Sequence, residues 1–437
     1  MAATQTPGRM PRLDGLDHTL SLMADPYRFI SGQCQRLNSD VFEARIMLQP
    51  TVCMRGAPAA ELFYDPARFV RAGAAPEPLR ASLFGKQAVQ GLDGAAHQVR
   101  KALFMQVLAP DRVQALAGHV RGQWQRAAGS WNGEQALPFY GACQQMLARA
   151  VCAWAGVPLP PEQAPQRTRE LAALFDDAAR GLRAHLHARL ARQRLERWLA
   201  GLIEQVRRDP TQAASDTALH AVAHHRDAQG ALLAPRVAAT ELLNILRPTV
   251  AVSVYLTFCA LALHRYPAVR ETLCEGEAAY RHAFLQEVRR YFPFFPAVAA
   301  RVRQDFTWQG HAFAAGRRVL LDLYGTNHDA RRWPEPDTFD PARFLAREPT
   351  PFDLIPQGGG HAERHHRCPG ENVAMAVMDV VLDGLLYELD YAVQPPGHMI
   401  DMARLPALPR AGLPIAVRRY VPRAASPASR SACTMAS

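Results

Sequence analysis

Apolar positions along most of the chain recur every three or four residues, which is the spacing of one face of an α-helix. This pattern runs through residues 162–208, 236–265, 278–292 and 371–389. Two other stretches, residues 44–56 and 300–329, alternate between apolar and polar positions, the second around a glycine turn. Alternation of this kind is typical of strands. The chain is therefore predicted to be mainly α-helical with a minor β-sheet, an α+β fold.

The most apolar of these helices, residues 236–265, contains Arg247 followed by Pro248. Arginine carries a permanent charge, which is costly to bury without a partner. Proline has no backbone N–H, and its ring clashes with the carbonyl four residues earlier, here that of Asn244. Two residues that disfavour a buried helix therefore stand side by side, and the arginine requires an anion that the neighbouring sequence does not obviously supply.

The pattern gives no linker and no internal repeat that would divide the chain. We therefore expect one domain over residues 16–420, with a flexible N-terminal tail over residues 1–15 and a disordered C-terminal tail over residues 421–437. The first twenty residues lack the apolar core of a signal peptide. The uncharged stretch between Arg247 and His264 is shorter than the ~20 residues that cross a bilayer, so no transmembrane segment is expected.

Composition narrows the function classes. The net charge is +10, but the basic residues are spread along helices, with no zinc-finger spacing, no aromatic RNA-binding motif and no basic arm, so nucleic acid is not an expected partner. The eight cysteines are scattered without a C-x-x-C pair, and Cys143, Cys152 and Cys259 lie in apolar runs. Buried free thiols argue against a disulfide scaffold and for a reducing compartment, so we expect the protein to be cytoplasmic.

The segment "HAERHHRCPGEN" places Cys368 after a loop rich in hydrogen-bond donors and before an expected helix start. The helix N-terminus and backbone amides favour the thiolate there, and a thiolate can ligate haem iron. The alternative is a zinc site, whose four candidate ligands are His361, His365, His366 and Cys368, although their spacing matches no common zinc motif. The segment alone leaves both interpretations open.

Two further segments bear on this choice. In "QEVRRYFP", Glu287 and Arg290 lie three residues apart on one helix face, which by itself indicates only a weak surface ion pair. In "PDTFDPARFL", Arg343 follows in a proline-bounded loop, and one carboxylate can bind two guanidinium groups.

Three motifs follow one another along the chain: Glu-x-x-Arg, then P-x-x-F-D-P-A-R-F, then a glycine-rich loop with a single cysteine. Because of these motifs and their order, the chain resembles a cytochrome P450 over nearly all its length. The resemblance implies the cytochrome P450 fold and a haem b cofactor. Cys368 would be the ligand of the haem iron, and Glu287, Arg290 and Arg343 a structural triad that locks the cysteine loop. His366 would hold a haem propionate, as would one of His97, Arg100 and Lys101. The loop departs from the usual pattern at His361 and Arg364, where a phenylalanine and a glycine are common.

The long helix also lacks the acid–alcohol pair with which P450 monooxygenases deliver protons to bound oxygen. With Arg247-Pro248 in its place, and with "LFGKQAVQGLDG", "LLDLYGTNHD" and "PQGGGHAERHHRCPGE", the chain resembles the bacterial fatty-acid peroxygenases. The resemblance implies that hydrogen peroxide is the co-substrate, that Arg247 binds the carboxylate of a long-chain fatty acid and that Pro248 shapes the helix around it. The carboxylate would serve as the acid–base group, and no redox partner would be required.

Two residues are expected to shape the outcome of the reaction. Gln90 fits the position that faces the haem and the first substrate carbons, where relatives that decarboxylate often carry histidine, so glutamine favours hydroxylation. Phe84 fits the wall near the acyl chain, with ordinary core packing as the alternative. A pinned carboxylate directs attack to the α or β carbon. Phe295 and Ala297 differ from the branch pattern, which leaves the choice between these carbons and the chain length open.

The leading hypothesis is therefore a haem-thiolate fatty-acid peroxygenase, an oxidoreductase that hydroxylates the α or β carbon. The alternatives are a decarboxylase that gives terminal alkenes, an oxygen-dependent P450 monooxygenase with a reductase partner, and, more distantly, a non-catalytic protein that binds haem or fatty acid.

Overall fold

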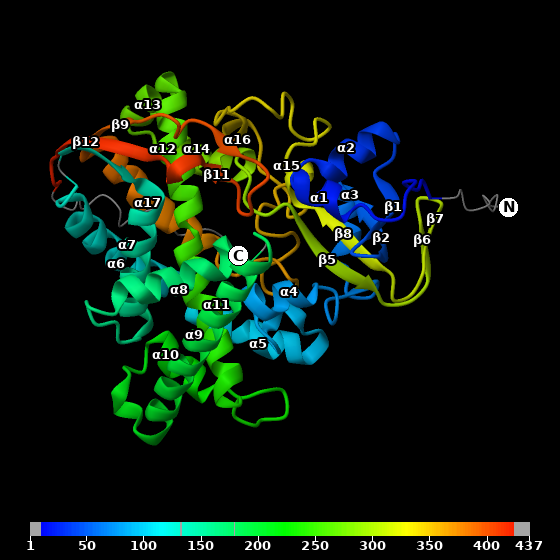
Figure 1. Ribbon diagram of the computed structural model, residues 1–437, viewed down its shortest axis with the longest axis horizontal. Coiled ribbons are helices and arrows are strands. Elements are labelled where there is room, and N and C mark those ends of the chain that lie inside the picture. The colour runs from blue at the N-terminus through cyan, green and yellow to red at the C-terminus, as the bar shows by residue number, and fades with distance from the viewer. Residues whose placement is uncertain (1–9, 132, 179, 424–437) are drawn as a thin grey trace.

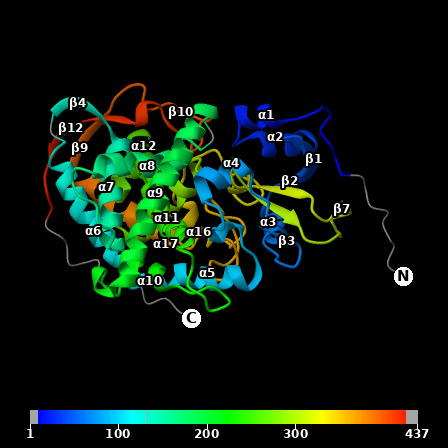
Figure 2. The same ribbon diagram turned by 60° about the horizontal axis from the view of Figure 1, so that its bottom comes forward.

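A computed structural model describes residues 10–131, 133–178 and 180–423 of the chain. Helices gather in one part of the molecule, and a five-stranded sheet lies beside them together with α1–α3 (Figure 1). Figure 2 shows the same division after a turn of 60°. The structure confirms the predicted fold, which is mainly helical with a minor sheet.

Each predicted periodic segment is helical in the structure, which also has helices outside these segments, one of them at residues 323–327 in the second alternating stretch. Their bounds are α1 Thr19–Ala24, α2 Phe29–Arg36, α3 Ala57–Phe63, α4 Glu77–Leu79, α5 Gly94–Val107, α6 Pro110–Ala128, α7 Phe139–Ala155, α8 Ala164–Asp176, α9 Leu182–Arg208, α10 Ala218–His224, α11 Pro235–Ala251, α12 Ser253–Arg265, α13 Pro267–Cys274, α14 Ala278–Tyr291, α15 Leu323–Asn327, α16 Arg343–Ala346 and α17 Glu371–Tyr387.

The strands form one larger sheet and three smaller ones. The larger sheet has the order β1-β2-β8-β5-β3, in which only β2 and β8 run parallel, and β4-β12-β9 form a three-stranded sheet. The two alternating stretches of the sequence supply β1, β2 and β5–β8, as predicted. The bounds are β1 Val41–Ile46, β2 Gln49–Met54, β3 Phe69–Val70, β4 Gly133–Pro138, β5 Ala297–Val302, β6 Phe306–Trp308, β7 His311–Phe313, β8 Arg318–Asp322, β9 Leu389–Val393, β10 Ile400–Asp401, β11 Leu408–Pro409 and β12 Pro414–Tyr420.

The N-terminal segment joins the fold earlier than we expected. Met10 and Leu13 are buried, and the amide of Leu13 donates to the carbonyl of Glu43 in β1 at 2.9 Å. Residues 10–13 therefore pack on the sheet, because their two apolar side chains reach its core, and a loose tail to residue 15 is wrong for this part. Residues 1–9 and 424–437, where most of the two predicted tails lie, are outside the described residues.

The long apolar helix is present as α11 and α12, which are separated by one residue, Val252. Pro248 lies inside α11, and the Val252 amide donates to the carbonyl of Thr249 at 3.2 Å, a tighter bond than the helical pattern. By length and composition the two helices together could span a membrane, but 94% of their most apolar window is buried inside the protein. They therefore form the central helix of the core, as predicted.

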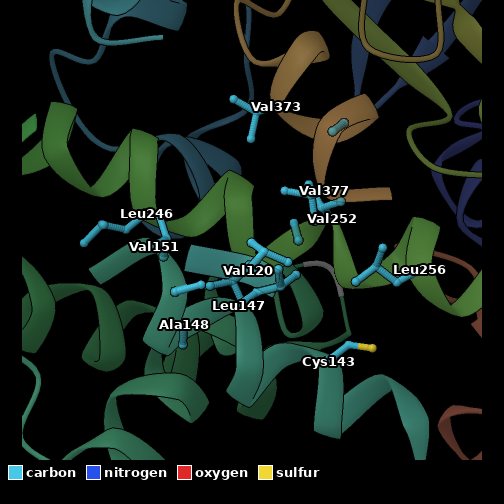
Figure 3. Close-up of a cluster of buried hydrophobic side chains, with 14 of the residues drawn as sticks. Val120, Cys143, Leu147, Ala148, Val151, Leu246, Val252, Leu256, Val373 and Val377 are labelled. Carbon is cyan, nitrogen blue, oxygen red and sulfur yellow. The ribbon is translucent and has the colours of Figure 1, made fainter. Parts of the chain in front are cut away.

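The main core packs α6, α7 and α17 around this central helix. Figure 3 shows Val120 of α6, Leu147 and Val151 of α7, Leu246 of α11 and Val377 of α17 in one cluster. These side chains are almost completely buried. Burying a large aliphatic side chain stabilises the fold by about 1.5–3 kcal/mol, so this cluster fixes the position of α11 and, with it, of Arg247.

Candidate functional site

The cysteine loop lies directly before α17. The amide of Cys368 donates to the carbonyl of Gln357 at 3.1 Å, which closes the loop, and the Gly370 amide lies 3.4 Å from the sulfur of Cys368. The side-chain amide of Gln357 lies 3.8 Å from the same sulfur. Two N–H donors thus point at the sulfur atom, an arrangement that suits a sulfur carrying negative charge.

Burial opposes negative charge on this sulfur. Burial and, next, the charge of Glu371 raise the pKa of the Cys368 thiol, and they outweigh the Gly370 amide, Lys101 and Arg289, all of which lower it. The helix N-terminus alone does not therefore produce a thiolate. A coordinating metal ion deprotonates a thiol outright, so the thiolate form requires the metal that it ligates.

The carboxylate of Glu287 joins two arginines, as the resemblance implied. Arg290 donates to both Glu287 oxygens at 2.7 and 2.8 Å, and Arg343 donates to one of them at 3.3 Å. Glu287 and Arg290 are fully buried, so this is not the surface pair that the spacing alone indicated. Arg290 also donates to the carbonyl of Asn327, whose side chain accepts from the Ile355 amide at the start of the cysteine loop. The three residues therefore anchor the chain that leads to Cys368.

A second buried ion network, which the sequence analysis missed, holds the loop from the other side. Glu371 accepts from Arg289 at 2.8 Å and from Arg367 at 2.8 and 3.0 Å. Arg289 also donates to the side-chain oxygen of Gln357 at 3.2 Å. This bond orients the Gln357 amide so that its N–H group faces Cys368. The residues come from α14, α17 and the loop, so no local sequence pattern joins them.

A cavity of about 970 Å³ lies between Cys368 and the central helix. Its lining is mainly apolar and contains most of the predicted site residues, namely Phe84, Gln90, His97, Lys101, Arg247, Pro248, His366 and Cys368. Arg100 is the exception. Its guanidinium points instead to the buried carboxylate of Glu241, at 2.5 Å. Arg100 is therefore removed from the expected cofactor-binding residues, because its charge is already paired.

Basic side chains gather at one part of the cavity. The rings of His97 and His366 have centres 3.9 Å apart and are tilted by 30°, and Arg71, which no sequence motif indicated, lines the same part. Burial lowers the pKa of His97 to about 4 and that of Lys101 to about 8, and it holds the pKa of His366 well below its usual value. An anion beside the two histidines would favour their charged forms.

Lys101 also contributes to the cysteine loop. Its ammonium donates to the carbonyls of His365 and Arg367, at 3.1 and 2.5 Å. Among the described residues, no three histidine, cysteine or acidic side chains converge as a metal site would require. The zinc interpretation of the cluster around His361 is therefore not supported.

Arg247 extends from α11 into the cavity and is only 6% exposed. Its one side-chain partner is the oxygen of Asn244 at 3.3 Å, and its Nε has no acceptor among the described residues. Burial, together with the positive charge of Arg192, lowers the pKa of Arg247 to about 9. Arg247 is thus a buried cation that lacks the anion needed to offset its desolvation.

The structure also settles whether Glu241 could be that anion. Its carboxylate is taken up by Arg100, by the Val89 amide at 3.0 Å and by the side chain of Asn244 at 3.2 Å. The same Asn244 amide lies 3.4 Å from the side-chain oxygen of Gln90. Asn244 therefore connects Gln90 and Arg247, and Glu241 remains occupied elsewhere.

Phe84 lies on a turn that a buried arginine holds in place. The guanidinium of Arg192, in α9, donates to the carbonyls of Ser82, Leu83 and Phe84 at 3.0–3.1 Å. Phe84 is half-buried and lines the cavity, so it forms part of its wall as well as packing against the core.

Comparison with known proteins places these features in a family. The family model described as Cytochrome P450 matches residues 277–416. Cytochrome P450 71D180 of Thymus vulgaris is 32% identical over 140 residues, which cover 30% of this chain and 27% of that protein. The putative cytochrome P450 132 of Mycobacterium tuberculosis is 32% identical over 147 residues, 33% of this chain and 31% of that protein. The chain thus matches less than a third of the length of these curated relatives.

Solved structures match over nearly the whole chain. Cytochrome P450SP alpha (CYP152B1) in complex with (R)-ibuprophen is 50% identical, with a TM-score of 0.90, and the match covers 92% of this chain and 98% of that one. Cytochrome P450EX alpha (CYP152N1) with myristic acid is 40% identical, with a TM-score of 0.90 and coverage of 94% and 100%. A variant of cytochrome P450 OleT in complex with arachidonic acid is 32% identical, with a TM-score of 0.91 and coverage of 95% and 100%.

Proposed function

Since the chain belongs to the cytochrome P450 family, we propose that it is a haem-thiolate peroxygenase that uses hydrogen peroxide to hydroxylate long-chain fatty acids at the α or β carbon. Two of the similar solved structures hold myristic and arachidonic acid, and a third holds ibuprofen. All three ligands are carboxylic acids with an apolar body. Their shared chemistry matches a mainly apolar cavity in which the buried guanidinium of Arg247 has no carboxylate partner among the described residues.

The residues of the cavity fit a haem b group. Cys368 would supply the thiolate ligand, and His97, Lys101, His366 and Arg71 form a buried cluster of basic side chains that would hold the propionates. When bound, the haem supplies the activation of peroxide and the transfer of its oxygen to a C–H bond. The two ion networks around Glu287 and Glu371 fix the loop, so the sulfur position is set before the cofactor binds.

Arg247 carries the proposal. It lines the same cavity as Cys368 and has no carboxylate partner among the described residues, so the carboxylate of a fatty acid would complete its ion pair. A carboxylate oxygen held there can accept a proton from peroxide and return it to the departing oxygen atom. Pro248 follows directly in α11 and also lines the cavity, where it shapes the wall beside the bound acid.

The position of the carboxylate also decides which carbon reacts. A carboxylate at Arg247 keeps the α and β carbons near the cysteine side of the cavity, while the rest of the chain extends along the apolar walls and past Phe84. Gln90 faces the same space, with its side-chain oxygen near Asn244. An amide cannot exchange protons as an imidazole does, and this favours hydroxylation over decarboxylation.

Because the substrate supplies the acid–base group, the proposal includes no redox partner. It also includes a cytoplasmic location, which rests on the free thiols of Cys34, Cys53, Cys143, Cys152 and Cys259 in the core. The test is to incubate the purified haem-loaded protein with a long-chain fatty acid and hydrogen peroxide, and in parallel with oxygen, NADPH and a P450 reductase system. Hydroxy acid with peroxide alone is the expected result. Product only in the parallel reaction would show an oxygen-dependent monooxygenase instead.

The ligand assignment has its own test. The reduced carbonyl adduct of the wild-type protein should show the red-shifted Soret band of a thiolate-ligated haem, and Cys368→Ala should lose it. A Cys368→Ala protein that keeps the band would contradict the assignment.

A further inference from the structure

A second buried arginine lines the same cavity. Arg318 begins β8, opposite Thr51 of the parallel strand β2 and Arg301 of the antiparallel strand β5. It is only 4% exposed, yet it contributes to the cavity wall. A guanidinium so placed has lost most of its water and needs protein or ligand acceptors in return.

Neutral groups are the only acceptors that the described residues offer it. Its Nε and Nη2 atoms donate to the hydroxyl of Thr51 at 3.0 and 2.8 Å, and Nη2 also donates to the carbonyl of Ile46. Within the described part of the chain, its Nη1 atom has no acceptor and no acidic side chain lies within ion-pair distance. Asp17 acts on Arg318 only from beyond ion-pair distance, and its two oxygens accept from the amides of Thr19 and Leu48. Within the described part of the chain, no carboxylate therefore pairs directly with Arg318.

Arg318 lies at the entrance side of the cavity. Met23 and Met47 line the cavity and are 53% and 43% exposed, so the cavity reaches the surface between α1 and the β1–β2 turn. The Ile46 carbonyl that Arg318 binds is adjacent to this turn. Arg318 lies in β8, between β2 and β5 of the five-stranded sheet, whereas Arg247 lies in α11 of the helical part. The two arginines therefore reach the cavity from different elements.

We infer that Arg318 forms a second carboxylate site, and that the enzyme takes long-chain acids with a second carboxylate at the far end, the α,ω-dicarboxylic acids. The inference rests on the proposed function, in which Arg247 binds the first carboxylate. A diacid of matching length would pair both buried guanidinium groups, and its methylene chain would lie on the apolar walls between them. A monocarboxylic acid would leave one of the two charges unpaired.

The geometry at Arg318 favours a carboxylate over a larger anion. Among the described residues, only the Nη1 atom of Arg318 lacks a protein acceptor. One carboxylate oxygen atom therefore completes the hydrogen bonding of the guanidinium. The site is close to the surface, so the second carboxylate keeps part of its hydration and loses less on binding than a fully buried one would. The reaction at the first carboxylate is unchanged, because the second group stays at the entrance.

The experiment compares α,ω-dicarboxylic acids of increasing chain length with their monomethyl esters. Each pair has almost the same length and shape, and only the diacid carries the second charge. Dissociation constants for the haem-loaded wild-type protein are measured by isothermal titration calorimetry. At the best-fitting length, we expect the diacid to bind about tenfold more tightly than its half-ester, as expected for a partly buried charge pair. The absence of a preference at every length overturns the inference.

Two variants and one control substrate complete the test. Arg318→Gln keeps a hydrogen-bonding side chain but should bring the diacid and half-ester to equal affinity, while Arg318→Lys should keep part of the preference. A preference that survives in Arg318→Gln also overturns the inference. A simple fatty acid, tested for binding and peroxide-driven hydroxylation in the wild-type protein, is the control substrate. If the wild-type protein does not convert that fatty acid, the proposed function fails, whatever the diacid comparison shows.

Discussion

Replacing Glu287 by glutamine tests whether the buried ion network is needed to hold the cysteine loop. Glu287 is fully buried and accepts two bonds from Arg290, one from Arg343 and one from the Asp340 amide at 2.8 Å. In Glu287→Gln the charge is lost, and an NH₂ group faces the donors of Arg290, which is itself completely buried. Breaking a buried ion pair by removing one partner costs about 3–5 kcal/mol, so the free energy of unfolding should fall by that amount.

The assay is equilibrium unfolding in urea, followed by circular dichroism, which reports the change in unfolding free energy between variant and wild type. Asp390→Asn is a matched control. Asp390 pairs with Arg418 at 3.8 Å, but the two side chains are 51% and 69% exposed, so removing this charge should cost less than about 1 kcal/mol. If Glu287→Gln lowers the free energy of unfolding no more than Asp390→Asn does, the buried network does not stabilise the fold.

Three further substitutions have distinct expected outcomes. Gln90→His should raise the ratio of terminal alkene to hydroxy acid in the products, measured by gas chromatography, because an imidazole can exchange protons near the β carbon. An unchanged ratio at preserved activity would show that Gln90 does not control the choice between decarboxylation and hydroxylation. Arg192→Met should raise the KM for a long-chain acid about tenfold while haem content stays unchanged, because the segment that carries Phe84 loses three buried hydrogen bonds from the guanidinium. An unchanged KM would show that Arg192 does not hold the cavity wall at Phe84. Burial raises the pKa of Asp322 to about 7, so between about pH 4 and pH 7 the folded protein holds one more proton than the unfolded protein. The free energy of unfolding should therefore fall as pH rises through this window. Asp322→Asn should flatten this pH dependence in urea unfolding, and an unaltered slope would contradict the expectation.

The sequence predicted the parts of the molecule that depend on local pattern. Helical periodicity located α8, α9, α11, α12, α14 and α17, and alternation located β1, β2 and β5–β8. The ordered motifs brought Glu287, Arg290 and Arg343 together correctly, because their spacing reflects one shared carboxylate. These predictions succeeded where the signal lies within a few turns of chain, or in motifs that the family keeps in fixed order.

The remaining features depend on contacts between distant segments. Arg100 was expected at the cofactor, but its partner Glu241 lies 141 positions away, and only the folded chain brings these two side chains together. Arg71 and Arg318 stand in no motif, and their importance comes from lining the cavity, which only the folded chain forms. The thiol of Cys368 was judged from its helix terminus, whereas burial in the folded protein has the larger effect on its pKa. Sequence pattern does not report burial of this kind.

Arg247→Ala tests whether Arg247 positions a carboxylate as the acid–base group. The variant should bind haem normally but lose roughly a hundredfold or more of its peroxide-driven activity on a long-chain acid, because a buried charge-assisted pair contributes a few kcal/mol. Loss of substrate binding alone could give the same result, so the decisive measurement uses a substrate without a carboxylate.

That measurement is the rate of peroxide-driven oxidation of a small arene, with and without an added short carboxylic acid, in wild type and in Arg247→Ala. We expect the short acid to raise the rate of arene oxidation in wild type, because the acid binds Arg247 and leaves the acyl-chain pocket free. In Arg247→Ala, we expect the added acid to leave the rate unchanged. If wild type oxidises the arene equally well without any acid, or if the acid rescues Arg247→Ala as well, the carboxylate at Arg247 is not the acid–base group.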